Sequence, residues 1–148
     1  MNEDKPYKYM AKWVIVPLQN GEKRPVNGLK EWQNLTHSNM TAEFYSKWHH
    51  CENWGLLTGR INGVFVVDID TKDNGIEYWN KLVSEHSIPK TRIVRTGSGG
   101  LHVYFKYEDW MDEFVGTNKV DVDGEKIGID LKTNKQQVLL DGCIHPTT

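Results

Sequence analysis

The stretch Val64-Phe-Val-Val-Asp-Ile-Asp70 decides the fold of this chain. Its apolar, β-branched beginning predicts a buried strand, and its two acids come where that strand ends. Side chains alternate between the two faces of a strand, so Asp68 and Asp70 share one face while Ile69 points to the other. Two carboxylates on one face favour a site for a hard cation.

Two further segments carry groups that complete such a site. Thr96-Gly-Ser-Gly-Gly-Leu-His102 is a glycine-rich turn ending in a histidine, and Ile129-Asp-Leu131 places a third acid between apolar residues. Three acids and a histidine on separate strand-like segments suit phosphoryl transfer assisted by two metals. Each segment alone also has a plain structural explanation, since acids end many strands and hairpins need glycine. Only their combination favours a functional site.

Length and composition predict one intracellular domain. The chain has 148 residues, 38% of them hydrophobic, with six tryptophans, which is enough for one well-filled core. Its apolar stretches are far shorter than a membrane span, so no membrane partner is expected. The two cysteines, Cys51 and Cys143, lack the spacing of a zinc site or a disulfide framework, which favours reduced thiols.

The formal net charge of −2 argues against a protein that binds nucleic acid over its whole surface, because nonspecific duplex binding needs many Lys and Arg contacts to phosphate. A local channel is still compatible with this charge. Basic residues gather at Lys23 and Arg24, at Lys90, Arg92 and Arg95, and at Lys132 and Lys135.

Alternating strand and helix signals predict one mixed α/β core. Strands are expected at residues 13–18, 55–57, 64–70, 92–95, 101–107, 127–132 and 137–140, with a hairpin turn at Asp123-Gly124. A short helix is expected at residues 109–114, and Thr41 is expected to cap a helix that runs through about His50.

A further helix is expected at residues 76–86. Asn74 with Glu77 forms the sequence pattern of a capping box, and an apolar stripe runs along one face of the helix. The stripe consists of Ile76, Trp79, Leu82 and Val83. Trp32, Trp48, Trp54 and Trp79 are expected in the core rather than as exposed platforms for nucleic-acid bases.

A series of motifs runs in order along the chain: Gly21-Glu-Lys-Arg-Pro25, Trp32, Trp54-Gly-Leu-Leu-Thr-Gly59, Val67-Asp-Ile-Asp70, Thr96-Gly-Ser-Gly-Gly-Leu-His-Val-Tyr-Phe105 and Gly128-Ile-Asp-Leu131. In this order they resemble the bifunctional primase-polymerase family, part of the archaeo-eukaryotic primase superfamily in plasmid, phage and large DNA virus replication proteins. The resemblance covers the chain from about Lys12 to its end. It implies an α/β (α+β) fold in which an RNA-recognition-motif-like sheet packs against a second small α/β unit, with the active site in the cleft between them.

The resemblance also implies a function. Residues 1–148 would form a single primase-polymerase catalytic domain, the N-terminal part of a longer replication protein of a mobile element or virus, in the host cytoplasm. The expected activity is that of a template-directed nucleotidyltransferase, a DNA primase or DNA polymerase. Nucleoside triphosphates and a single-stranded DNA template are the expected partners. This chain has no Gly-x-x-x-x-Gly-Lys-Ser/Thr motif, so no helicase ATPase is expected within it. The resemblance implies a helicase domain in the same longer polypeptide, since such a region commonly lies downstream in related replication proteins.

The resemblance assigns roles to particular residues. Asp68, Asp70 and Asp130 would hold Mg²⁺ or Mn²⁺, and His102 would contact the phosphates of the incoming nucleotide. The other expected nucleotide-binding residues are Ser98, Gly99, Gly100, Lys132 and Arg92.

Two departures from the family pattern accompany these assignments. Gly100 stands where the superfamily often has the serine of Ser-x-His, and Ser98 lies two residues earlier. Asp141-Gly-Cys-Ile-His-Pro146 stands where related sequences often show Pro-Pro-Ser-x-His, so Cys143 and His145 are left out of the catalytic set.

Two other functions fit parts of the pattern. A noncatalytic nucleotide- or nucleic-acid-binding module would keep the sheet without turnover, although the joint presence of three acids and His102 speaks against it. A phosphatase of the haloacid dehalogenase type also begins with an apolar strand and Asp-x-Asp. That class expects Thr or Val where Lys72 stands, and it expects the strand to open the domain.

Overall fold

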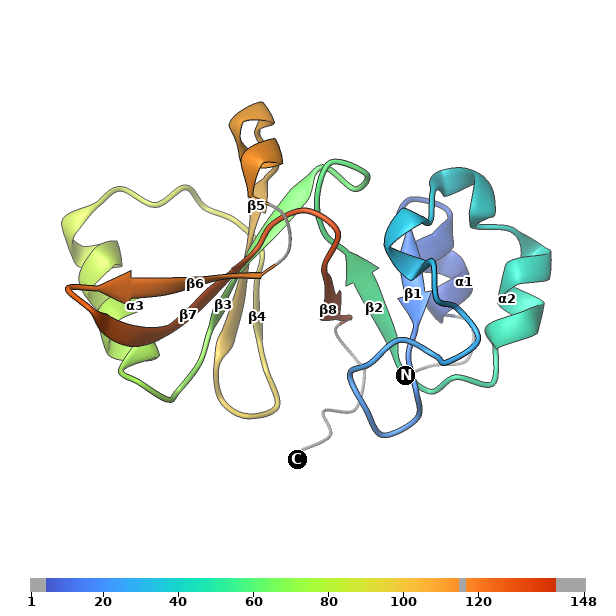
Figure 1. The fold of residues 1–148 in the computed structure, drawn as a ribbon, viewed down its shortest axis with the longest axis horizontal. Coiled ribbons are helices and arrows are strands. Elements are labelled where there is room, and N and C mark those ends of the chain that lie inside the picture. Colours follow the sequence, from blue (N-terminus) through green and yellow to red (C-terminus); the bar gives the residue numbers. More distant parts are fainter. Residues whose placement is uncertain (1–4, 115–116, 141–148) are drawn as a thin grey trace.

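Two antiparallel sheets with few helices make up the protein, in a computed structural model that describes residues 5–114 and 117–140. Figure 1 shows them as two parts side by side: a five-stranded sheet with helix α3, and a three-stranded sheet beside helices α1 and α2. The mixed α/β fold class is therefore confirmed, and it is consistent with a primase-type α+β domain.

The smaller sheet has the order β1-β2-β8, from β1 (Ile15–Pro17), β2 (Trp54–Leu57) and β8 (Gln137–Leu139). Between β1 and β2 the chain forms η1 (Trp32–Asn34), η2 (His37–Asn39) and α2 (Ala42–Trp48). The Thr41 hydroxyl accepts a hydrogen bond from the Phe44 N–H at 3.2 Å, which confirms the predicted cap of α2. Helix α1 (Lys5–Met10) was not predicted.

The larger sheet has the order β4-β5-β3-β7-β6. Its strands are β3 (Val64–Ile69), β4 (Ile93–Arg95), β5 (Leu101–Lys106), β6 (Thr117–Val122) and β7 (Glu125–Lys132), with η3 (Asp109–Glu113) following β5. The predicted acidic strand, β3, lies in the middle, where both of its edges are paired. The Asp123-Gly124 turn joins β6 to β7 as predicted, with positive φ at both residues.

Helix α3 (Gly75–Glu85) covers one face of the larger sheet, where Trp79 packs with Ile69 and Val103. Two details of its prediction were wrong. Asn74 adopts the left-handed conformation, with φ 57° and ψ 27°, and its side chain makes no capping bond, because a capping side chain needs extended backbone at that residue. Val83 is 44% exposed, since it lies about 100° around the helix from Leu82, which packs on the sheet.

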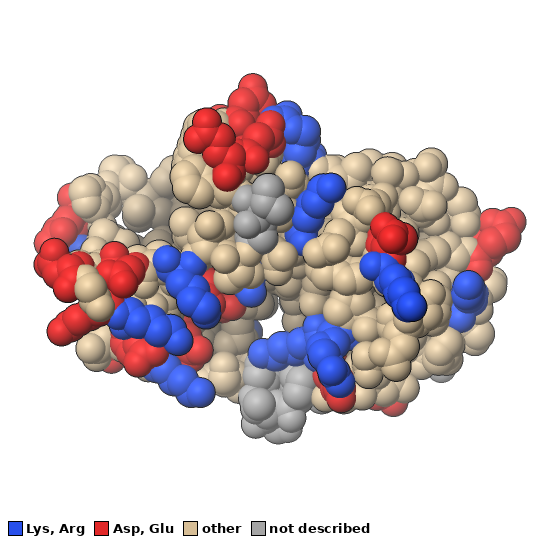
Figure 2. All heavy atoms as spheres, in the orientation of Figure 1, with Lys and Arg blue, Asp and Glu red and all other residues tan. Residues whose placement is uncertain are grey.

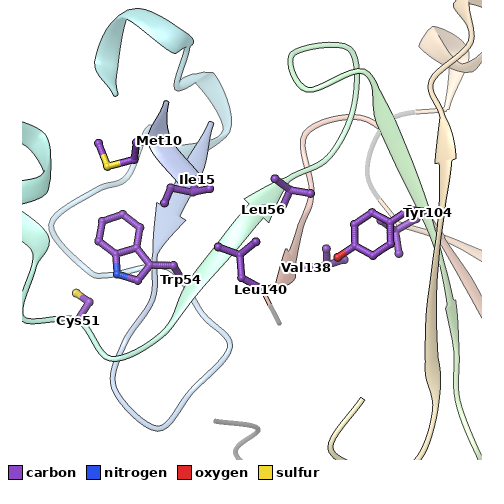
Figure 3. Packing of buried hydrophobic residues seen from close by; sticks show 9 residues of the cluster. Met10, Ile15, Cys51, Trp54, Leu56, Tyr104, Val138 and Leu140 are labelled. Carbon is purple, nitrogen blue, oxygen red and sulfur yellow. The ribbon is translucent and has the colours of Figure 1, made fainter. Parts of the chain in front are cut away.

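The other face of the larger sheet meets the smaller sheet through an apolar seam. Val66 of β3 and Tyr104 of β5 belong to one buried cluster with Leu56, Val138 and Leu140. Figure 3 shows Tyr104 directed toward Val138 of β8, with Leu140 just after that strand in the same cluster. This seam holds the two parts together along one stretch of their common boundary.

Two chain connections cross from one sheet to the other and bond to each other. The Thr58 N–H donates to the Gln136 carbonyl at 2.7 Å, and the Lys135 N–H donates to the Thr58 carbonyl at 3.1 Å. Beside them, the buried Asn62 amide bonds to the backbone of Val14 and Leu57. The connections therefore fix the two sheets relative to each other.

Of the four tryptophans expected in the core, Trp54 and Trp79 are buried, while Trp32 and Trp48 are half-buried. No helix within residues 5–114 and 117–140 is long and apolar enough to cross a membrane. Cys143 and His145 lie outside the described residues.

The packing of α3 predicts unequal costs for two truncations on one helix. Trp79→Ala should lower the free energy of unfolding by about 3–5 kcal/mol, because it empties a buried site between α3 and the sheet. Val83→Ala is the matched control on the exposed side, with an expected change within about 0.5 kcal/mol. Urea unfolding measures both, and equal losses would contradict the orientation of the helix.

Candidate active site between two sheets

Four polar and charged side chains form a row across the larger sheet, on the face opposite α3. The strand register pairs Val94 with His102, His102 with Asp68, Asp68 with Asp130, and Asp130 with Lys119. Residues paired in this way point to the same face, with Cβ atoms about 4.5–5.5 Å apart. The register therefore brings two of the predicted acids and the predicted histidine side by side.

Asp68 and His102 form the contact at the centre of this row. His102 Nε2 lies 3.3 Å from Asp68 Oδ1. The His102 side chain is 12% exposed and the Asp68 side chain is 31% exposed. Burial alone would raise the pKa of the Asp68 carboxyl, but the hydrogen bond and charge of His102, with the charges of Lys132 and Lys23, hold it below its ordinary value. Asp68 is thus an ionised carboxylate at neutral pH.

The second nitrogen of His102 has no partner. Nδ1 is buried and makes no hydrogen bond to any residue in the described part of the chain. A buried polar nitrogen without a partner costs free energy and calls for an explanation, such as a ligand or a water molecule at the site. His102 therefore has bonding capacity left beyond its contact with Asp68.

Asp130 is held on its other side by Lys119, whose Nζ lies 3.7 Å from Asp130 Oδ2. No three His, Cys, Asp or Glu side chains within residues 5–114 and 117–140 form a group that could hold a metal ion as they stand. The donor set itself fits a hard divalent cation, because it consists of carboxylates on one face of adjacent strands. The backbone register fits such a site, while the side chains of Asp68 and Asp130 are engaged in separate pairs.

Asp70 follows the end of β3, at the start of a loop that folds back onto β7. Its N–H donates to the Gly128 carbonyl at 2.7 Å, and its side chain accepts from the Lys72 N–H at 3.2 Å. The Gly128 N–H in turn donates to the Asp73 carbonyl. A Cβ on Gly128 would lie 2.0 Å from the Lys72 carbonyl oxygen, so only glycine allows this close approach.

Asp68 and Asp70 border a cavity of about 840 Å³ between the two sheets. Asp68, Asp70, His102 and Lys132 line it, whereas Asp130 lies next to Asp68 in the sheet without lining it. Residues of the smaller sheet form the opposite wall, including Gln137, Val138 and Leu139 of β8. The cleft between two units that the resemblance implies is therefore present, with predicted site residues along it.

The glycine-rich turn contributes only part of its length to the cavity. Gly97 and Ser98 line it, and the Ser98 hydroxyl lies 3.3 Å from that of Thr96. Gly99 has a positive φ of 90°, and Gly100 packs against the Ile69 carbonyl at the base of the turn. Gly99 and Gly100 thus shape the hairpin, while Gly97 and Ser98 face the cavity.

Basic residues come to the cavity from both walls. Lys23, Arg24, Arg95 and Lys132 line it, and Figure 2 shows Lys and Arg side chains around the hollow between the two parts. Arg92, in contrast, does not line the cavity and lies over the Tyr104 ring at 5.6 Å. The cavity therefore combines carboxylates with an excess of cations, as a site for a phosphate ligand and metal requires.

Sequence reasoning missed Lys119 as a neighbour of the acids. A regular hairpin around Asp123-Gly124 would place Lys119 opposite Gly128, but the register shifts between Lys119 and Asp121 and pairs Lys119 with Asp130. No residue pattern in this segment predicts that register shift. Trp32 and Gln137 were also missed as cavity residues.

The comparison with protein families gives one match. The family model described as "Bifunctional DNA primase/polymerase, N-terminal" matches residues 7–148, which include every residue of the site. No curated protein matches the chain.

The close contact at Gly128 predicts that Asp70 depends on it. Gly128→Ala should cost about 1–3 kcal/mol of stability, because its Cβ forces the Lys72 carbonyl away, and it should displace the loop that begins at Asp70. Chemical denaturation measures the first effect, and the NMR shift of the Asp70 amide measures the second. Lys126→Ala, an exposed change in the same strand, is the control. An unchanged Asp70 amide would disprove the coupling.

Proposed function

Because this chain belongs to the bifunctional DNA primase/polymerase N-terminal family, we propose that it is a template-directed nucleotidyltransferase that joins nucleotides on single-stranded DNA by two-metal phosphoryl transfer. The family establishes a function of the DNA primase or polymerase type in general. The observation that carries the finer proposal is the in-register row of Asp130, Asp68 and His102 beside a cavity with cations on both walls.

Asp68, Asp70 and Asp130 would hold Mg²⁺ or Mn²⁺. Bound there, the cations would favour ionisation of the primer 3′-hydroxyl and stabilise the charge of the leaving pyrophosphate. The low pKa of Asp68 supports this role, because a metal ligand must be ionised. For Asp130 to join, its carboxylate must leave Lys119, a contact between partly exposed groups that contributes little stability.

His102 and the basic residues would bind the triphosphate. His102 Nδ1, which makes no hydrogen bond among the described residues, would bond to a phosphate oxygen, and Lys132 lies two pairing positions along the sheet from the Asp68–Asp130 pair. Ser98 and the backbone of the glycine turn would supply neutral donors at the same cavity. Arg92 is the weakest member of the proposed set, since its side chain packs on Tyr104 away from the cavity.

A noncatalytic binding module is the second candidate, and one observation favours it. Asp68 and Asp130 each contact a side chain of this chain, His102 and Lys119, so both carboxylates have a partner without metal. A module that only binds nucleotide would need no further cation. The two candidates differ in metal dependence and in turnover.

The proposal predicts metal-dependent binding of nucleoside triphosphate. Calorimetry with Mg²⁺ should detect binding that chelator abolishes, and an Asp68→Asn/Asp70→Asn double variant should weaken it at least about tenfold by removing metal ligands. Asp123→Asn, in an exposed turn, is the matched control and should bind as the unmodified protein does. Equal affinity for the triphosphate with Mg²⁺ and with chelator would show that its binding does not depend on a metal.

It also predicts nucleotide addition on a template. Labelled nucleotides should be joined on single-stranded DNA, with or without a supplied primer, in Mg²⁺ or Mn²⁺. His102→Ala should fold normally and lower the activity by about 1.5–3 kcal/mol in transition-state stabilisation, because it removes one charge-assisted contact to phosphate. If triphosphate binds but no product forms on any template, in this chain or in a longer natural protein that contains it, the binding module is the correct function.

A further inference from the structure

A loop of the smaller sheet brings cations to the wall opposite the carboxylates. Lys23 and Arg24 belong to the segment between β1 and η1, and both line the cavity. The Arg24 guanidinium donates to the Glu22 carboxylate at 2.7 Å, so a neighbour already balances its charge. Lys23 is exposed and makes no ion pair within the described residues. Lys23 is thus the available cation on this wall.

The backbone of this loop is fixed, although the Lys23 side chain has no ion-pair partner in the part of the chain that the structure describes. Leu18 forms a β-bridge with Pro25, and the Gln19 N–H donates to the Arg24 carbonyl at 2.8 Å. The Val26 N–H donates to the Pro17 carbonyl at 3.1 Å. The loop therefore closes on the end of β1, which restricts where the Lys23 side chain begins.

The contact that ties Lys23 to the cavity wall comes from the far end of the chain. Gln137 of β8 donates from Nε2 to the Lys23 carbonyl at 2.6 Å. Its Oε1 is buried without a hydrogen-bond partner among the described residues. A buried polar atom without a hydrogen bond destabilises the protein, so the Gln137 side chain makes its bond to Lys23 while Oε1 stays unsatisfied.

Gly55 of β2 makes this arrangement possible. A Cβ at Gly55 would lie 2.0 Å from Gln137 Oε1, so the Gln137 amide lies over the bare backbone of the neighbouring strand. Gly55 has no positive φ that would otherwise explain the glycine. The glycine thus leaves room for the side chain that holds the Lys23 backbone.

We propose that Lys23 binds phosphate oxygens of the nucleoside triphosphate from the wall opposite His102 and Lys132, and that Gln137 is the positioning residue that holds Lys23 there. This inference rests on the proposed function of the same cavity. Lysine suits the role because its ammonium is a mobile point charge with three donors, while the fixed loop lowers the cost of ordering it. The triphosphate would then be bound from both sheets at once.

The first test compares Lys23 variants by calorimetry in Mg²⁺, with a nonhydrolysable deoxynucleoside triphosphate analogue as the probe. Lys23→Ala should weaken its binding about tenfold, as expected for the loss of one charge-assisted contact, without lowering the melting temperature. A nucleoside monophosphate should be affected less, because it has fewer phosphate oxygens within reach. Lys23→Arg should restore most of the affinity, and Lys81→Ala, exposed on α3, is the matched control.

A single-stranded oligonucleotide is the second probe, because a template backbone offers the same phosphate chemistry. Loss of oligonucleotide binding with unchanged triphosphate binding would overturn the assignment to the triphosphate. Unchanged binding of the triphosphate to Lys23→Ala would overturn the inference while leaving the proposed function in place. Absence of triphosphate binding in the unmodified protein would instead defeat the proposed function itself.

The role of Gln137 is tested by a double-mutant cycle with the same triphosphate probe. Gln137→Met keeps the length of the side chain and removes its donor, so it should weaken binding severalfold in the unmodified background and have no effect in the Lys23→Ala background. Additive losses would show that Gln137 acts independently of Lys23 and would overturn its positioning role. Thermal unfolding verifies that the variants fold; if Gln137→Met does not, Gln137→Leu replaces it in the same cycle.

Discussion

The apolar seam between the two sheets is the interaction on which the site depends. Val66 and Tyr104 of the larger sheet pack with Leu56, Val138 and Leu140 beside the smaller one (Figure 3). Each fully buried aliphatic side chain contributes about 1.5–3 kcal/mol, so several together match much of the net stability of a small domain, about 5–15 kcal/mol. Where the seam ends, the two sheets border the cavity, and the walls face each other.

The strand β3 passes from the seam to the cavity within a few residues on one face. Val66 packs into the seam, and Asp68, two residues on, lines the cavity. Partial burial there removes water from the carboxylate, which by itself favours the neutral acid, so the site needs nearby cations to keep Asp68 ionised. His102 acts on the Asp68 carboxylate from the adjacent strand, and the charges of Lys132 and, from the other sheet, Lys23 add to its effect.

The charges are arranged so that a ligand must replace contacts that already exist. His102 pairs with Asp68, and Lys119 pairs with Asp130, so both carboxylates already have a partner in the protein alone. The Lys23 backbone, by contrast, is fixed, and its ammonium makes no ion pair within residues 5–114 and 117–140. A polyanion entering the cavity would therefore meet Lys23 on one wall, and Lys132 and Arg95 beside the paired row on the other. Cations bound with it would compensate the carboxylates that it approaches.

The sequence alone determined the central strand, its two same-face acids, the capped α2 and the Asp123-Gly124 turn, because alternation, caps and turn residues are local signals. Local signals failed at Asn74, where the chain must fold back beside Gly128 and takes a left-handed conformation instead of a capping one. Only the tertiary structure decided that Lys119 lies beside Asp130, through a register shift, and that Gln137 holds Lys23 across 114 residues of chain. Such contacts depend on how the sheets pack, because residues distant in sequence meet only where the core places their strands.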